Sequence, residues 1–394
     1  MKNTSLAFLF LTLLSISCEQ VKYPVVKQYG GAELDRSVSI AEIPYEGFAM
    51  AGYTEESGSE DILIIRTDSE GNEIWKKTYG DLGDEAGWSI EHLSGEGFIL
   101  AGFTTSWGNG ENDIFLMRLD VDGNELWKKT YGGSGDDYAW NMKVTSLGNF
   151  LVVGQIFDSL TSSTNFYMML TDTAGSVLWE KMEGDPNARD RAYSVVEDQD
   201  GNFVVCGGSQ TQGSEDITNI RLAKVDPNGA TIWAKVFDTE THDIAHSIVE
   251  MNDGNYMTVG YTGRNRQEGN FDALIKKIDK NGNELWTKKY DKDGDNRFIT
   301  GLKTTAGNCA AIGYSFKPGS PTATHLLLVD GEGALLGEEQ FALEGSNTGY
   351  DLIESKSGEF AITGHFENDS TRNRDALFIK SDLGKKIKKQ WHYE

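Results

Sequence analysis

Residues 120–133 read DVDGNELWKKTYGG, and variants of this stretch recur along the chain at intervals of about 50 to 54 residues. Each copy begins with an aspartate and, three residues later, a glycine. The aspartate side chain can cap a tight turn, and the glycine supplies the positive φ that the turn needs. The copies begin at Asp68-x-x-Gly71, Asp120-x-x-Gly123, Asp172-x-x-Gly175, Asp226-x-x-Gly229, Asp279-x-x-Gly282 and Asp330-x-x-Gly333, with a shorter seventh at Asp382-x-Gly384. The column predicts structural hairpin turns rather than a catalytic or metal site.

A strand with an aliphatic residue followed by tryptophan comes after each of the first five turns. The pairs are Ile74-Trp75, Leu126-Trp127, Leu178-Trp179, Ile232-Trp233 and Leu285-Trp286, whereas Gly337 and Lys388 replace tryptophan in the last two copies. Tryptophans at such regular spacing predict packing between repeat units rather than sugar stacking.

A second column consists of short apolar runs that end in glycine. The runs are Phe48–Gly52, Phe98–Gly102, Phe150–Gly154, Phe203–Gly207, Tyr256–Gly260, Cys309–Gly313 and Phe360–Gly364. We interpret them as buried strands whose glycines permit close approach of a neighbouring backbone.

Each unit therefore supplies four strands and no helix. In the second unit the expected strands are 88–92, 97–103, 113–119 and 124–131. Seven such units predict an all-β fold, a seven-bladed β-propeller with four antiparallel strands per blade, formed by residues 25–394 as a single domain. Either Val25–Gly30 or Ile387–Trp391 completes the last blade, because both imitate the end of a repeat.

The N-terminus has the parts of an export signal. Lys2 is followed by the apolar stretch Leu6–Leu14, which is too short to span a bilayer. Ser15-Ile16-Ser17-Cys18 resembles the lipobox of bacterial lipoproteins in the relaxed form of Bacteroidetes, although serine replaces the usual leucine at position 15. The resemblance implies a signal peptide over 1–17, acylation of Cys18 (palmitate) and a linker over 18–24. The chain would then be anchored in the cell envelope, at the outer membrane, facing the periplasm or the surface; a plain secretory signal is the alternative.

The formal net charge of −25 disfavours binding to nucleic acid or to anionic lipid surfaces. We therefore expect a monomeric propeller whose membrane contact depends on the lipid anchor. The lysine run at 385–389 is expected to solvate an edge strand. Cys206 and Cys309 fall in non-neighbouring units, so we interpret them as buried apolar residues.

The stretch from Gly123 to Gly133 with Gly135-Asp136-Asp137 resembles a secreted β-propeller repeat of bacteria and archaea. The resemblance covers about residues 24–391. It implies the fold and says almost nothing about function.

Loop variation points to one face of the propeller. The loops between the second and third strands are long and differ between units, and they lie on the same face as the connections between blades, which makes this the predicted binding face. The candidate residues on it are an acidic column of Asp35, Asp84 (or Glu85), Asp137, Asp190, Asp243 and Asp295, together with the loop residue Trp107. The carboxylates either form a ring that holds a cation or cap the start of the innermost strand.

Aromatic residues follow the acidic column at Trp88, Trp140, Tyr193, His246 and Tyr350. Their parity matches that of the apolar strand residues two positions further on. Because shared parity places side chains on the same sheet face, we expect these rings to pack between blades, with sugar stacking as the alternative.

Metal and cofactor signals are weak. Asp291-x-Asp293-Gly294-Asp295 resembles a calcium loop, but its glycine stands one place early and no helix flanks it. His242 and His246 have a helical spacing in a segment that is expected to be a strand, so no zinc site is predicted. We expect no cofactor apart from possible calcium.

No nucleophile elbow, phosphate loop or ranked carboxylate pair is recognisable. The sequence therefore favours a non-enzymatic module that binds or scaffolds an envelope protein or glycan. The alternatives are a glycan-active hydrolase or lyase with carboxylates at the axis, and a structural subunit of an outer-membrane assembly.

Overall fold

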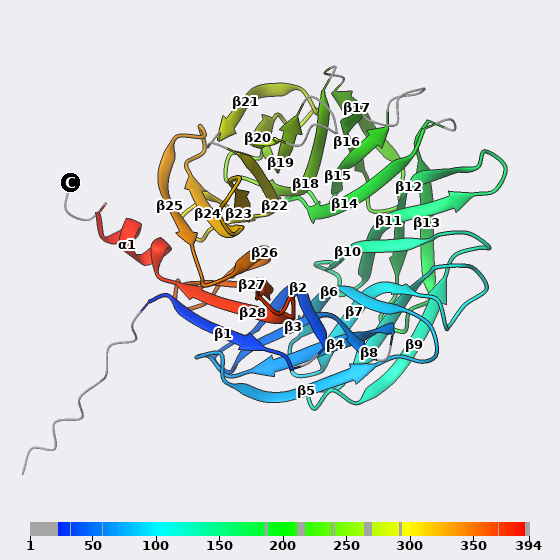
Figure 1. Ribbon diagram of the computed structural model, residues 1–394. Helices are drawn as coiled ribbons and strands as arrows, with labels where there is room; N and C mark the ends of the chain where they lie inside the picture. Colours follow the sequence, from blue (N-terminus) through cyan, green and yellow to red (C-terminus); the bar gives the residue numbers. More distant parts are fainter. Residues whose placement is uncertain are drawn as a thin grey trace, which may run out of the picture.

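The computed structural model describes residues 23–390 apart from 32, 57, 186–187, 211–216, 238, 240, 264–269, 291–293 and 369. Seven four-stranded antiparallel sheets surround a central axis (Figure 1), which confirms the predicted seven-bladed propeller. The signal segment, the lipobox and Cys18 lie outside the described residues. No helix within the described part of the chain has the length and apolar character needed to cross a bilayer.

Each blade runs from an innermost strand at the axis to an outermost strand at the rim. The first three blades are β2 (Leu34–Ile43), β3 (Gly47–Glu56), β4 (Ser59–Thr67), β5 (Glu73–Tyr79); β6 (Glu85–Leu93), β7 (Gly97–Thr104), β8 (Asp113–Leu119), β9 (Glu125–Tyr131); and β10 (Tyr138–Val144), β11 (Phe150–Asp158), β12 (Ser163–Thr171), β13 (Val177–Glu183). The next two are β14 (Asp190–Glu197), β15 (Phe203–Gln210), β16 (Thr218–Val225), β17 (Thr231–Phe237); and β18 (His242–Glu250), β19 (Tyr256–Gly263), β20 (Asp272–Ile278), β21 (Glu284–Tyr290). The last two are β22 (Asp295–Lys303), β23 (Cys309–Phe316), β24 (Ala323–Val329), β25 (Leu335–Phe341); and β26 (Ser346–Glu354), β27 (Phe360–Glu367), β28 (Arg374–Ser381), β1 (Val25–Tyr29).

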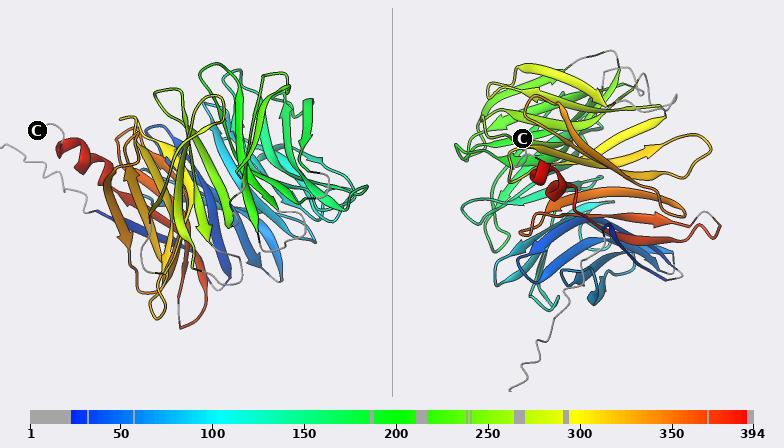
Figure 2. Two further views of the ribbon diagram at one scale, coloured as in Figure 1. Left: turned by 90° about the horizontal axis from the view of Figure 1, so that it is seen from above. Right: turned by 90° about the vertical axis from the view of Figure 1, so that its left-hand side faces the viewer.

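The N-terminal strand closes the ring. β1 pairs antiparallel with β28 and forms the outermost strand of the last blade. Because that position is occupied, the C-terminal segment forms the helix α1 (Leu383–Gln390) at the rim (Figure 2). Two predictions are therefore wrong: the seventh turn at Asp382-x-Gly384 and the edge strand at the lysine run.

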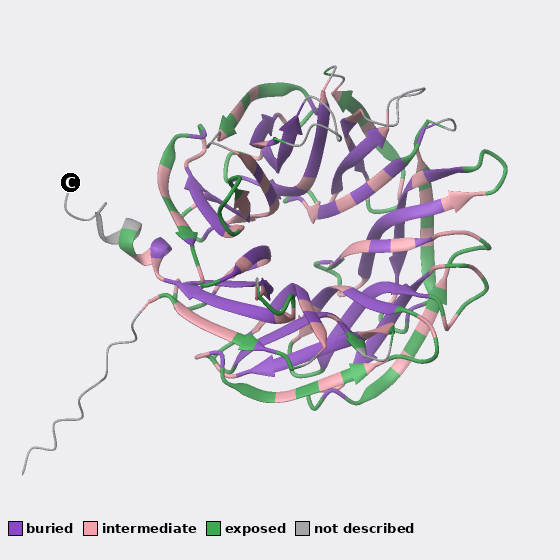
Figure 3. Ribbon diagram, in the orientation of Figure 1, coloured by how far each residue is buried: buried purple, intermediate pink, exposed green. Residues whose placement is uncertain are grey.

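The repeated turn and tryptophan columns have the predicted roles. The Oδ1 atom of Asp120 accepts hydrogen bonds from the backbone N–H groups of Asp122 (2.9 Å) and Asn124 (2.8 Å), and Gly123 has a φ of 75°. Trp179 donates its indole N–H to the carbonyl of Pro227 in the turn of the next blade (2.9 Å). The middle strands are buried and the outermost strands are largely exposed (Figure 3), so the core lies between successive blades. Both free cysteines are buried within it.

The glycine column permits a β-bulge in every innermost strand. A Cβ atom at Gly154 would lie 1.8 Å from the carbonyl oxygen of Tyr138, and the six equivalent glycines show the same clash at 1.9 Å. In each blade this glycine pairs with the residue just before the bulge, as Gly154 does with Ala139. The bulged residues, one per blade, are Val38, Trp88, Trp140, Tyr193, His246, Ile299 and Tyr350.

Candidate functional site

The innermost strands surround an axial cavity of about 910 Å³. All seven bulged residues line it, and the five aromatic ones are only partly buried. The rings do pack against rings of neighbouring blades, as expected, but they also line the axial cavity, which the assumption of an uninterrupted alternation along the strand did not foresee. A β-bulge adds one residue and changes the face to which the following side chains point.

The rings form a nearly continuous aromatic belt around one end of the cavity, called the mouth below, which is the end nearer the start of the innermost strands. Ring centroids lie 5.1 Å apart for Trp88 and Trp140, 6.0 Å for Trp140 and Tyr193, and 4.8 Å for Tyr193 and His246. Tyr53 extends the belt from Trp88 at 6.4 Å. These polarisable faces suit a planar aromatic ligand.

Arginines interrupt the aromatic belt at the same level. Arg297 forms a two-point ion pair with Asp295 (2.7 and 2.9 Å) and lies over the ring of Tyr261, 4.9 Å from its centroid. Arg36 lies between the rings of Tyr53 and Tyr350, at 5.4 and 5.6 Å. Arg36 thus places positive charge at this level, whereas the charge of Arg297 is offset by Asp295.

Arg191 lines the cavity on the blade next to His246. Among the described residues it forms no ion pair, so its charge is available to an anion. Arginine is well suited to this task because its planar guanidinium matches the oxygen geometry of sulfate, phosphate and carboxylate groups.

His246 is the titratable group of the aromatic belt. Burial, followed by the charges of Arg297 and His242, lowers the pKa of His246 to about 4. The imidazole is therefore uncharged at neutral pH. A neutral ring nitrogen that faces a cavity can act as a base or as a nucleophile.

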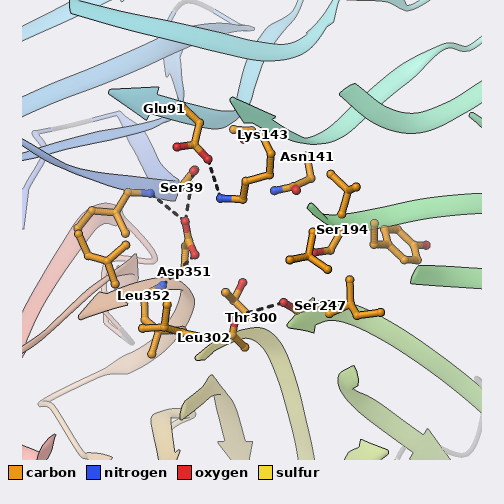
Figure 4. A pocket seen from close by; sticks show the side chains of 18 of the residues that line it. Ser39, Glu91, Asn141, Lys143, Ser194, Ser247, Thr300, Leu302, Asp351 and Leu352 are labelled. Atoms are coloured by element: carbon orange, nitrogen blue, oxygen red, sulfur yellow. Dashed lines mark hydrogen bonds and ion pairs between the residues drawn. The ribbon is translucent and has the colours of Figure 1, made fainter. Parts of the chain in front are cut away.

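Below the aromatic belt, the residue after each bulge is polar and faces the channel (Figure 4). This polar belt consists of Ser39, Ser89, Asn141, Ser194, Ser247, Thr300 and Asp351. Its side chains connect neighbouring blades: Thr300 donates to the carbonyl of Tyr350 (2.8 Å), and Ser39 accepts from the backbone N–H of Ile90 (3.2 Å). The polar belt thus mainly holds neighbouring blades together around the axis.

Three charged groups lie within the channel at this depth. Lys143 forms an ion pair with Glu91 (2.6 Å), and Asp351 accepts from the backbone N–H of Ile40 (3.0 Å) and from the hydroxyl of Ser39 (3.2 Å) (Figure 4). Burial raises the pKa of Asp351 to about 6, and its hydrogen bonds and the charge of Lys143 oppose this shift.

The predicted acidic column does not line the cavity. Asp137 is fully buried and accepts backbone N–H bonds from Gly133 (2.6 Å) and Phe157 (2.7 Å). Asp190 accepts the backbone N–H of Asp185 (2.8 Å), and Asp243 accepts the hydroxyl of Thr241 (2.9 Å). These contacts are those expected of side chains that cap the start of the innermost strand.

The remaining predicted residues are also away from the axis. Asp35 is buried, 3.8 Å from the ammonium of Lys76, and the second blade uses Glu85 in the equivalent position. Asp84 is exposed and accepts the backbone N–H of Glu60 (2.9 Å).

Trp107 packs into the core between the first two blades. Its ring lies 5.7 Å from that of Phe115, and the ammonium of Lys128 lies 3.9 Å above it.

Within the described residues, no group of three or more histidine, cysteine or acidic side chains is arranged to hold a metal ion. The calcium-like segment contains residues 291–293, which are outside the described residues, and Asp295 is paired with Arg297. His242 is buried and its ring packs on Phe271 (5.7 Å between centroids).

Sequence reasoning missed the bulge, although the strands carried a signal for it. Two successive residues break the apolar pattern in several copies, as in Trp140-Asn141, Tyr193-Ser194 and His246-Ser247. Two adjacent residues that both avoid the core do not fit strict alternation, and a bulge explains them.

The fold and its axial cavity define a β-propeller with one aromatic mouth. Its architecture is similar to that of Sqt1 from Chaetomium thermophilum, with a TM-score of 0.51 and 10% identity over 90% of this chain and 99% of that one. It is also similar to a puromycin hydrolase, with a TM-score of 0.54 and 12% identity over 84% of this chain and 50% of that one. At these identities the likeness concerns the fold alone. No curated protein is significantly similar to the chain.

The sequence model of the arylsulfotransferase family matches residues 123–373, more than half of the chain. The chain therefore belongs to the arylsulfotransferase family. The expectation of a non-enzymatic binding or scaffolding module is wrong, because this family indicates enzymatic sulfotransfer. The alternatives of a glycan-active enzyme and of an assembly subunit are overturned by the same match.

Proposed function

We propose that this protein transfers a sulfuryl group from an aryl sulfate to a phenolic acceptor in the axial cavity. The observation that carries the proposal is an uncharged histidine, His246, in an aromatic belt that lines the same cavity as Arg191, an arginine with no acidic partner among the described residues. The family match supports it independently.

Each part of an aryl sulfate has a matching surface in this cavity. The arene fits against the faces of Trp140 and Tyr193, which are adjacent in the belt. The sulfate oxygens fit the guanidinium of Arg191, which concentrates positive charge where negative charge grows as the leaving oxygen departs.

We assign His246 as the nucleophile. Its ring nitrogen attacks the sulfur atom, the bond from sulfur to the aryl oxygen breaks, and the arene leaves as a phenolate that keeps the bonding electron pair. The acceptor oxygen then attacks the same sulfur, the nitrogen–sulfur bond breaks, and its electron pair returns to the imidazole. The phenolic proton of the acceptor passes to solvent or to the released phenolate, so the enzyme ends unchanged.

Hydroxyl groups of the polar belt are weaker candidates for this role. Ser39 donates its hydroxyl to Asp351 (3.2 Å) and Thr300 donates its own to the carbonyl of Tyr350 (2.8 Å), so both hydroxyls are engaged in hydrogen bonds between blades. His246 needs no deprotonation, because its pKa is already about 4.

Release of 4-nitrophenolate from 4-nitrophenyl sulfate, with formation of phenyl sulfate from added phenol, tests the activity. We expect turnover in the parent protein and a loss of ~10³-fold or more in His246→Gln. His92→Gln is the matched comparison for position within the cavity, because His92 lines the same cavity but packs on Phe98 (5.8 Å) at the other end of its strand. Absence of transfer with any aryl sulfate, or full activity of His246→Gln, would falsify the assignment.

We also propose that the protein is exported and held in the envelope by lipid on Cys18. Tyr23, the first described residue, donates its hydroxyl to Glu359 (2.8 Å) beside the β26–β27 turn, on the face opposite the mouth. An anchor that precedes Tyr23 would therefore leave the mouth facing away from the membrane. Loss of acyl labelling and of membrane association in Cys18→Ala is the expected result; unchanged labelling would contradict it.

A further inference from the structure

The seam between the last and first blades contains a second cationic cluster, separate from His246 and Arg191. Arg36 starts the innermost strand of the first blade, and Arg374 starts β28 in the last blade. His365 lies on β27 with its ring stacked on Tyr350, 5.6 Å between centroids. All of these residues lie on the face where the cavity opens.

Two polar atoms of this cluster are buried and have no partner. They are Nε of Arg36 and Nδ1 of His365, and the whole side chain of His365 is only 8% exposed. Buried polar atoms are nearly always hydrogen-bonded, so each of these atoms has an unused hydrogen-bonding site.

The electrostatics of the cluster select the sign of that ligand. Burial and the charges of Arg36 and Arg374 lower the pKa of His365 to about 3, so two cations surround a neutral imidazole. Arg374 is paired with Glu367 (2.7 Å), whereas Arg36 forms no ion pair with any described residue. Arg36 is partly buried, and its charge acts on Glu60 without an ion pair between them, so its guanidinium keeps donors for an oxyanion.

The rings of Tyr53 and Tyr350 hold the guanidinium of Arg36 in place between them. From Tyr53 the aromatic belt continues through Trp88 and Trp140 toward His246. A ligand that reaches from the seam to His246 would therefore have an anionic end, an aromatic body and a second reactive end.

We propose that Arg36, His365 and Arg374 form a second oxyanion subsite, which binds the acid group of an aryl acceptor whose phenol reaches His246. This inference rests on the proposed sulfotransfer for the role of the ligand, but not for its binding. The preferred acceptors are then phenols with a carboxylate on a short arm.

Binding of unreactive ligands tests the subsite without catalysis. Calorimetry compares 3-phenylpropionate with 3-phenylpropan-1-ol, its neutral counterpart, on the full mature chain. We expect the carboxylate to bind ~10- to 100-fold more tightly, and Arg36→Gln to abolish this preference while the affinity for the alcohol is unchanged. Lys289→Gln, which removes one exposed charge on β21, is the charge-matched control and should keep the preference.

Three further measurements make the outcome decisive. Arg36→Lys retains the charge, so it should keep part of the preference even if Arg36→Gln folds poorly. Histidine NMR should show the pKa of His365 rising when the carboxylate binds. Equal affinities for acid and alcohol, or discrimination only for 2-phenylethanesulfonate, would overturn the acceptor subsite. Failure of transfer from 4-nitrophenyl sulfate to phenol would instead count against the proposed function alone.

Discussion

Replacing Gly154 by alanine tests whether the glycine column creates the site. The added Cβ atom would lie 1.8 Å from the carbonyl oxygen of Tyr138, whereas ordinary contacts begin at 3.4 Å. The carbonyl would therefore have to move by about 1.6 Å, within the strand that carries Trp140. Backbone cannot rotate away as a side chain can, so the full overpacking penalty of about 1–3 kcal/mol or more is expected.

Gly133→Ala is the matched control. Gly133 has no positive φ, and nothing lies within 4 Å of the position its Cβ would occupy. Alanine there should be neutral or stabilise the protein by about 0.4–1 kcal/mol, because it restricts the unfolded chain. The two variants, which carry the same chemical change, should thus differ by about 1–4 kcal/mol in the free energy of unfolding.

Urea unfolding followed by tryptophan fluorescence and far-UV circular dichroism measures this difference, and coincident transitions justify the two-state treatment. Near-UV circular dichroism reports the packing of Trp140 in the aromatic belt. If Gly154→Ala unfolded at the same urea concentration as Gly133→Ala, with an unchanged near-UV spectrum, the link between glycine, bulge and aromatic belt would be refuted.

Three other perturbations have defined outcomes. The pKa of Asp351 is about 6 in the folded chain and about 3.8 in the unfolded chain, so the folded state binds the proton more tightly. The free energy of unfolding should therefore fall by ~1–2 kcal/mol as pH rises from 4 to 6, after allowing for solvent in the channel. Asp351→Asn should flatten this dependence in urea titrations at pH 5 and 7.5. Since the pKa of His246 is about 4, kcat/KM for aryl sulfate should stay level above pH 5 and decline only as the imidazole gains a proton near pH 4; a decline centred near pH 6.5 would contradict the lowered pKa. Tyr29→Phe removes the hydroxyl that β1 donates to the carbonyl of Gly71 and should lower the free energy of unfolding by about 1 kcal/mol. The control is Tyr45→Phe, on an exposed turn. Equal stabilities of the two variants would show that this contact does not contribute to ring closure.

The turns and the blade core were predictable because each depends on local chemistry that repeats. Asp120 caps its own turn, and Trp179 meets the turn of the next blade at a fixed distance along the repeat. Because the same local structure is repeated, such a column of residues can be recognised in a single sequence. Closure of the ring was not predictable, because Val25–Gly30 and the C-terminal segment both imitate a strand, and only the pairing of β1 with β28 decides between them.

The candidate site was not predictable by alternation, because alternation is the rule that the bulge breaks. Asp137 and Asp190 belonged to the conspicuous acidic column, yet both carboxylates accept nearby backbone N–H groups and lie away from the cavity. His246 was discounted for its helical spacing to His242, a criterion that concerns metal ligands and not a residue set in an aromatic belt. The unpartnered atoms of Arg36 and His365 depend on contacts between the first and last blades, which no local pattern encodes.

The bulge explains how a nearly uniform repeat can hold a specific site. The glycine and its clash are the same in all seven blades, so every blade presents one side chain to the axis at the same depth. Substitution at that position does not alter the core, because the bulged residue lies outside the alternating apolar pattern. Chemistry can therefore vary there, from Val38 to His246, without loss of the blade. The seam adds a second source of asymmetry, since residues from the two ends of the chain meet only there, and this is where the unpaired Arg36 lies.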